Sequence, residues 1–143
     1  CEVARQMGVD SFVFSPKDYA SKAGFESEIV ARCRVAGVEL ICLAGYMRIV
    51  GPTLLDAYRG RIINLHPSLL PSFKGAHAIE QALEFGVKVF GATIHYVDET
   101  LDGGRIIAQR AVPYEGNDID ELTAAIHAVE HDLYIDTINK LLK

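Results

Sequence analysis

The 143-residue sequence predicts an α/β fold, a three-layer sandwich around a mixed, mostly parallel sheet. Segments with strand and helix patterns alternate from residue 11 to residue 85, which is typical of parallel strands joined by helices. Two β-rich runs with a short connection follow, and the chain ends in a long amphipathic segment. This length fits one domain, spanning residues 1–143.

The first elements are predicted from apolar spacing and from glycine and proline. Residues 1–8 resemble the last turns of a helix, so we expect the chain to begin within the fold, without its first strand and loop. Residues 11–14 predict a short strand, and residues 18–36 predict a helix that ends before Gly37. The apolar run 38–45 predicts a central strand with both faces covered.

The middle of the chain continues the alternation. Residues 52–58 predict a short helix with Pro in its first turn, and residues 61–66 predict the next strand. Residues 67–75 contain two prolines and a glycine, so they predict a loop, and residues 78–85 resume a helix. This loop follows the carboxyl end of a strand, where open α/β sheets place their sites.

The last third of the chain predicts a hairpin and a helix. Residues 88–97 and 105–112 are β-rich, and the connection 98–104 favours antiparallel pairing. The spacing of apolar residues after Asp118 predicts a helix to residue 141, with Asp118 as its cap.

Composition excludes several classes of function. The net charge of −5 and pI near 5.5 argue against nucleic-acid binding, which requires clustered Lys and Arg. Charges interrupt every apolar run before the length of a membrane span. Cys1, Cys33 and Cys42 lack the spacing of zinc ligands and are odd in number, so we expect buried thiols rather than disulfides or zinc ligands, and a cytoplasmic location.

Three polar residues are candidates for catalysis. Asn64 and His66 lie two apart on a strand, so their side chains point to the same side, and Asp102 comes from a separate loop. An amide beside an imidazole can stabilise an oxyanion, and a carboxylate can orient the imidazole. Residue type alone also fits a turn residue, a strand-end histidine and a hairpin Asp-Gly-Gly, which are structural roles.

The other histidines have competing interpretations. His127, Glu130 and His131 match the His-x-x-Glu-His pattern of some zinc proteases, but no third ligand from another helix is evident, and we expect no metal. His95 fits a packed histidine and a partner for Asp102 equally well, and His77 fits a solvent-facing position at a helix start.

Three longer motifs resemble the folate-dependent formyltransferases. They are residues 63–75 (INLHPSLLPSFKG), residues 43–50 (LAGYMRIV), and His95 to Val97 together with residues 101–104 (LDGG). The resemblance covers nearly the whole chain and implies the formyltransferase fold. Pro67 and Phe73 place the chain with the members that act on glycinamide ribonucleotide, because hydrolytic members usually have His at position 67 and tRNA-directed members Arg or Trp near position 73.

The resemblance implies an enzyme of purine biosynthesis and one-carbon metabolism. It implies formyl transfer from 10-formyltetrahydrofolate, a co-substrate, to the amine of glycinamide ribonucleotide, without metal. Asn64 and His66 would stabilise the formyl oxygen, and Asp102 would hold His66 and help to move the proton. The expected partners are these small molecules, with no nucleic acid or membrane, and the oligomeric state is open.

The resemblance also implies two sets of binding residues. The folate would contact Lys22, Leu43, Met47, Arg48, Ile49, Val50, Val97 and Asp98. The ribonucleotide would contact Gly45, Met47 and Pro67, with Glu130 at its ribose hydroxyls and His127 near its phosphate. Lys22 fits a solvated cation at a helix start equally well, and the phosphate loop of the family would precede residue 1. Hydrolysis, another acceptor amine or a folate-binding module remain the alternatives.

Overall fold

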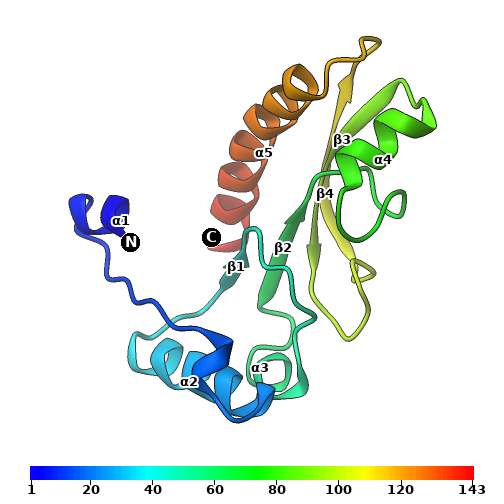
Figure 1. Cartoon of the computed structure of the whole chain (residues 1–143). Coiled ribbons are helices and arrows are strands. Elements are labelled where there is room, and N and C mark those ends of the chain that lie inside the picture. The colour runs from blue at the N-terminus through cyan, green and yellow to red at the C-terminus, as the bar shows by residue number, and fades with distance from the viewer.

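The computed structural model describes all 143 residues and contains one four-stranded sheet in the order β1-β2-β3-β4 (Figure 1). The strands are β1 (Ile41–Leu43), β2 (Ile62–His66), β3 (Val89–Tyr96) and β4 (Ile106–Pro113). β1 and β2 are parallel, whereas β2 with β3 and β3 with β4 are antiparallel. The predicted α/β class and mixed sheet are confirmed. The parallel share is smaller than expected, because β3 returns antiparallel to β2 before the hairpin adds a second antiparallel pair.

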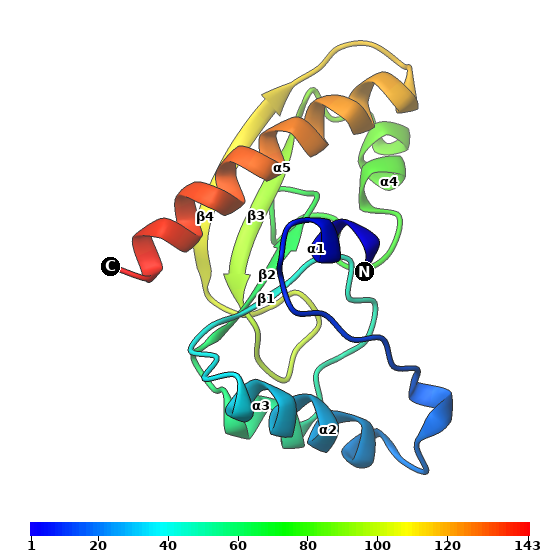
Figure 2. The same ribbon diagram turned by 90° about the vertical axis from the view of Figure 1, so that its left-hand side faces the viewer.

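The helices are α1 (Glu2–Gln6), α2 (Lys22–Val35), α3 (Pro52–Ala57), α4 (Ala78–Phe85) and α5 (Ile119–Leu141), with a 3-10 turn at Pro16–Asp18. α5 runs along one face of the sheet, and α2 and α3 lie together below the end of the sheet at which β1 and β2 begin (Figures 1 and 2). None of these helices is both long enough and apolar enough to cross a membrane.

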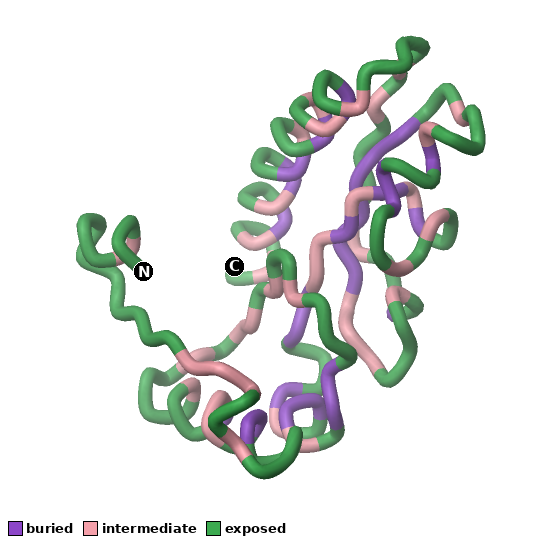
Figure 3. Tube along the Cα trace, viewed as in Figure 1, coloured by how far each residue is buried: buried purple, intermediate pink, exposed green.

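Two neighbouring residues of β2 connect the helix layers to the sheet. Ile62 packs in a cluster with Leu54 and Leu55 of α3, whereas Ile63 packs with Leu133 of α5. Successive side chains of a strand point to opposite faces, so these two fully buried residues fix a layer on each side of β2. Buried positions follow the centre of the sheet and the inner side of α5 (Figure 3).

The N-terminal third differs most from the prediction. The strand predicted at residues 11–14 is absent, because no strand lies beside it to pair with its backbone, and Phe14 instead packs on Phe25 of α2. The helix predicted from residue 18 begins at Lys22, since Ser21 accepts a hydrogen bond from Gly24 N–H and caps it there.

The strand predicted at residues 38–45 is shorter and lies elsewhere in the sheet. β1 has three residues and is an edge strand, so the prediction of a central strand was wrong. One face of β1 is not fully covered, because Cys42 is exposed. Cys1 is exposed as well, so the prediction of buried thiols is wrong for these two cysteines.

The later elements agree closely with the prediction. α4 has the predicted bounds, and the two β-rich runs form the antiparallel pair β3 and β4. The Asp118 side chain accepts hydrogen bonds from the N–H groups of Asp120 and Glu121, which confirms it as the cap of α5.

Candidate active site

A cavity of about 560 Å³ opens where β1 and β2 end. Because these strands are parallel, their carboxyl ends meet at one edge of the sheet, and the segments that follow them form neighbouring walls. Residues 43–50 form one wall, the turn 97–102 forms another, and α5 contributes His127, Glu130, His131 and Tyr134.

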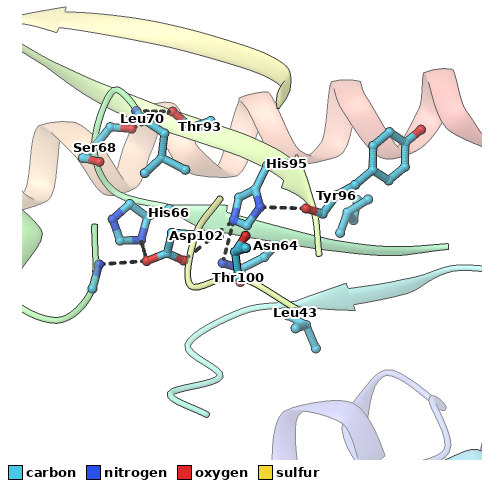
Figure 4. A network of polar contacts seen from close by, with 12 residues as sticks. Leu43, Asn64, His66, Ser68, Leu70, Thr93, His95, Tyr96, Thr100 and Asp102 are labelled. Atoms are coloured by element: carbon cyan, nitrogen blue, oxygen red, sulfur yellow. Dashed lines mark hydrogen bonds and ion pairs between the residues drawn. The ribbon is translucent and has the colours of Figure 1, made fainter. Parts of the chain in front are cut away.

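Asn64 is oriented by His95 on the neighbouring strand. The two residues face one another in the register of β2 and β3. His95 Nδ1 lies 2.9 Å from the Tyr96 carbonyl oxygen, which can only accept, so Nδ1 has the proton and Nε2 is an acceptor. Asn64 Nδ2 therefore donates to His95 Nε2 across 3.2 Å, and its second N–H stays available (Figure 4).

His66 lies between two acceptors. Its Nε2 donates to the Phe73 carbonyl oxygen at 2.8 Å, and its Nδ1 lies 3.5 Å from Asp102 Oδ2. The imidazole is buried, with 6% exposure. Both ring nitrogens thus face an oxygen acceptor, and these two contacts orient the imidazole.

Asp102 lies beside both histidines of the site. Its Oδ2 accepts a hydrogen bond of 2.8 Å from Gly75 N–H, and its Oδ1 lies 3.8 Å from His95 Nε2. The residue has a φ of 49°, a left-handed conformation that Asp and Asn tolerate better than most side chains. The sequence-predicted Asn64, His66 and Asp102 thus lie together, with His95 as the fourth member (Figure 4).

The loop after His66 is held by a buried polar network. Thr93 Oγ1 accepts from Leu70 N–H and donates to the Ser68 carbonyl oxygen. Gln109 Nε2 of β4 donates to the Leu70 carbonyl oxygen at 2.9 Å and also to Thr93 Oγ1. Because this loop leads to Phe73, the network sets the position of the carbonyl that orients His66.

Two side chains at the cavity, Asp98 and Tyr134, have pKa values shifted from the ordinary ones. Asp98 accepts from the hydroxyl and the backbone N–H of Thr100, and these bonds lower the pKa of its carboxyl group. On the opposite wall, burial raises the pKa of Tyr134, whose hydroxyl donates to the Leu43 carbonyl oxygen at 2.7 Å. His127 Nδ1 lies 2.7 Å from Glu130 Oε2, so these two residues of α5 form a pair at the cavity.

Most of the sequence-predicted site residues line this one cavity. They are Leu43, Gly45, Met47, Arg48, Ile49, Val50, Asn64, His66, Pro67, Val97, Asp98, Asp102, His127 and Glu130. Lys22, the first residue of α2, is exposed and does not line the cavity, so its contact with folate stays a prediction.

Sequence reasoning missed several residues of the cavity. Tyr46 and Tyr134 had no polar signal, because aromatic residues within apolar stretches resemble core positions. His77 is exposed, as expected, but it also lines the cavity. No group of three or more His, Cys, Asp or Glu side chains is arranged to hold a metal ion.

The comparisons with known proteins agree on one family. A family model described as formyl transferase matches residues 1–138. Phosphoribosylglycinamide formyltransferase of Bacillus subtilis is 51% identical over 142 residues, which are 99% of this chain and 73% of that protein. The trifunctional purine biosynthetic protein adenosine-3 of Drosophila melanogaster is 47% identical over 90% of this chain, which spans 10% of that protein.

Solved structures have the same fold. The crystal structure of phosphoribosylglycinamide formyltransferase from Bacillus halodurans superposes with a TM-score of 0.95 at 52% identity. The match covers 99% of this chain and 74% of that protein. Glycinamide ribonucleotide transformylase 1 from Geobacillus kaustophilus gives a TM-score of 0.95 at 54% identity, covering 99% of this chain and 76% of that one.

Proposed function

We propose, because this chain belongs to the formyl transferase family, that it transfers the formyl group of 10-formyltetrahydrofolate to the amine of glycinamide ribonucleotide in purine biosynthesis. The observation that supports this most directly is the cluster of Asn64, His66, His95 and Asp102 at the cavity. It combines an amide donor, imidazole rings and a carboxylate, which are groups that acyl transfer to an amine can use.

The proposed chemistry uses no covalent enzyme intermediate. The folate supplies the formyl group: the amine nitrogen bonds to the formyl carbon, the bond to the folate nitrogen breaks, and one proton passes between these nitrogens. Asn64 would donate its free N–H to the formyl oxygen as negative charge develops there. His66 would lie beside the same oxygen and help to stabilise it. Asp102 would hold His66 and move the proton, directly or through water.

The wall formed by residues 43–50 is the proposed folate site. Its apolar side chains suit a flat heterocycle, and its backbone N–H and C=O groups, together with Val97 and Asp98, can bond the heterocycle edge. Lys22 remains a candidate contact for a more distant part of the folate. These assignments fit the cavity, whose volume of about 560 Å³ is of the size that holds a small-molecule ligand.

The ribonucleotide is proposed to lie toward α5. Glu130, which is buried to 7% exposure, would accept hydrogen bonds from the ribose hydroxyls, and His127 would approach the phosphate. Gly45, Met47 and Pro67 would contact the rest of the substrate from the strand ends.

The enzyme's domain organisation, partners and location are also proposed. We propose one domain over residues 1–143, because all four strands form one sheet. Small molecules are the proposed partners. All three cysteines are free, which supports a location in the reducing cytoplasm.

An assay with a 10-formyl folate analogue tests the proposal, since loss of the formyl group changes the absorbance of the analogue. We expect turnover that depends on added glycinamide ribonucleotide. Turnover without the ribonucleotide would indicate hydrolysis instead, and binding of the analogue without any turnover would indicate a folate-binding module.

A further inference from the structure

The wall formed by residues 43–50, the proposed folate site, has few hydrogen bonds of its own. Residues 44–50 take part in no backbone–backbone hydrogen bond, and none of their side chains makes a hydrogen bond. Their path is therefore set by side-chain packing and by the residues at the two ends. At one end is β1, and at the other is Gly51, which immediately precedes α3.

Gly51 is fixed by a buried carboxylate from another helix. Glu26 of α2 is 1% exposed, and its Oε2 accepts a hydrogen bond of 2.7 Å from Gly51 N–H. Its Oε1 accepts from Leu54 N–H at 3.3 Å. Both oxygens thus bond free N–H groups at the start of α3, where the helix has no side-chain cap of its own.

The fit at this point leaves no room for a side chain on Gly51. A Cβ there would lie 2.6 Å from Glu26 Oε1, which is closer than such atoms approach. The absence of a Cβ lets the carboxylate reach the backbone directly. Glu26 therefore ties the last point of the wall to the α2 and α3 layer.

The charge of Glu26 also reaches the wall itself. Burial, and after it the Glu26 carboxylate, raises the pKa of Tyr46, while Arg48 acts in the opposite direction. The Tyr46 hydroxyl is buried and has no hydrogen-bond partner in the protein, and its ring packs on the cluster around Leu54 and Leu55. Glu26 thus affects the wall at two points, at the end beside Gly51 and at Tyr46.

We propose that Glu26 is a positioning residue for folate binding, because it fixes the course of residues 44–50 without touching the cavity. The inference rests on the proposed function insofar as the ligand of this wall is the folate. It assigns a binding effect to a carboxylate that would otherwise be a helix cap.

Glu26→Gln tests this role with little change of shape, because an amide nitrogen replaces one of the two acceptors. We expect the KM for the formyl folate to rise roughly tenfold, the effect of losing one hydrogen bond to a charged group. The kcat and the KM for the ribonucleotide should stay within about threefold of wild type. Glu26→Asp, which keeps the carboxylate, should restore part of the folate affinity.

Glu28→Gln is the matched control, because Glu28 lies on the same helix but pairs with Arg32 at the surface. It should leave the KM for the formyl folate unchanged. Hydrogen exchange without substrate should show faster exchange at the amides of Gly51 and Leu54 in Glu26→Gln alone. A fall in kcat with unchanged folate KM, or equally faster exchange throughout the chain, would overturn the inference.

Titration with a non-reactive folate analogue separates this inference from the proposed function. Wild type that binds the analogue without transferring a formyl group would refute the proposed function, and weaker binding by Glu26→Gln would still support the inference. Wild type that does not bind the analogue would refute both.

Discussion

Asp102→Asn separates proton handling from loop geometry. Asn tolerates the left-handed φ of 49° and keeps an oxygen that can accept from Gly75 N–H, so the loop should stay in place. The negative charge beside His66 is lost. We expect kcat to fall by about 10²–10⁴-fold, the usual contribution of a proton-transferring group, with folate affinity within a few-fold of wild type.

Asp102→Ala is the companion to this variant. It loses the charge and also the hydrogen bond to Gly75, so we expect the folate affinity to fall as well. An Asp102→Asn enzyme with unchanged kcat would show that the carboxylate has only a structural role, which is what an Asp-Gly-Gly turn alone indicates.

Glu130→Gln should weaken ribonucleotide binding without slowing the chemical step. Glu130 Oε2 lies 2.7 Å from His127 Nδ1, so the carboxylate is already oriented toward the cavity. Loss of its charge should raise the KM for the ribonucleotide about tenfold, with little change in kcat. Steady-state kinetics with the ribonucleotide varied provide the measurement. Glu121→Gln, an exposed change on the same helix, should behave as wild type, and equal KM values for the two variants would refute the assignment.

The sequence predicted the candidate catalytic residues but not the residues that orient them. Asn64, His66 and Asp102 lie in motifs that resemble a known family, so catalytic roles could be proposed for them from the sequence. Glu26 had no such signal, because its partner Gly51 lies 25 residues away and only the tertiary fold brings them together. His95 had two equal interpretations until its register opposite Asn64 was known.

The turn at residues 98–104 should lose stability in acid. Hydrogen bonds from Thr100 lower the pKa of Asp98, so the folded state favours the carboxylate. The resulting stability is present above the unfolded pKa of about 3.9 and is lost as the pH falls through the lower folded value. Because Asp98 is partly exposed, Asp98→Asn should cost less than about 1 kcal/mol at pH 7 and nothing once the pH is below both values.

Urea unfolding of wild type and Asp98→Asn at several pH values measures this difference. Asp132→Asn is the control, since Asp132 is exposed and accepts no hydrogen bond, and its effect should not vary with pH in the same way. A cost of Asp98→Asn that grows on acidification would contradict the direction of the pKa shift.

Elements with strong local signals were predicted well, and those that depend on neighbours were not. α4 and α5 have clear apolar periods and end signals, so their bounds agree with the prediction. A strand exists only where another strand pairs with it, which apolar residues alone cannot indicate. Residues 11–14 have the composition of a strand but no partner, and β1 pairs over only three residues with β2.

On the scale of the whole molecule, α5 connects the cavity to the sheet. Its inner side packs against β3 through Ile126 and Leu133, and its middle turn faces the ends of β1 and β2. The amphipathic spacing predicted this helix, and the resemblance implied His127 and Glu130 as binding residues, but Tyr134 could not be distinguished from a core residue in the sequence. A contact over 91 residues, from Tyr134 to Leu43, fixes the helix at the site.

Tyr134→Phe should destabilise the whole molecule because this hydroxyl joins α5 to both parallel strands. It donates to the Leu43 carbonyl oxygen of β1 at 2.7 Å and approaches the Ile63 carbonyl oxygen of β2 at 3.4 Å. Burial raises the pKa of Tyr134 above its ordinary value of about 10, so the hydroxyl is a donor at neutral pH. Its loss leaves a strand carbonyl without this partner, so we expect a cost of about 1–2 kcal/mol in the free energy of unfolding. Urea unfolding gives the value, and Tyr114→Phe, which removes exposed bonds to Asp118, should cost less than about 0.5 kcal/mol. Equal losses for the two variants would show that the Tyr134 hydroxyl does not link the helix to the sheet, and that apolar packing alone holds α5 over the strands.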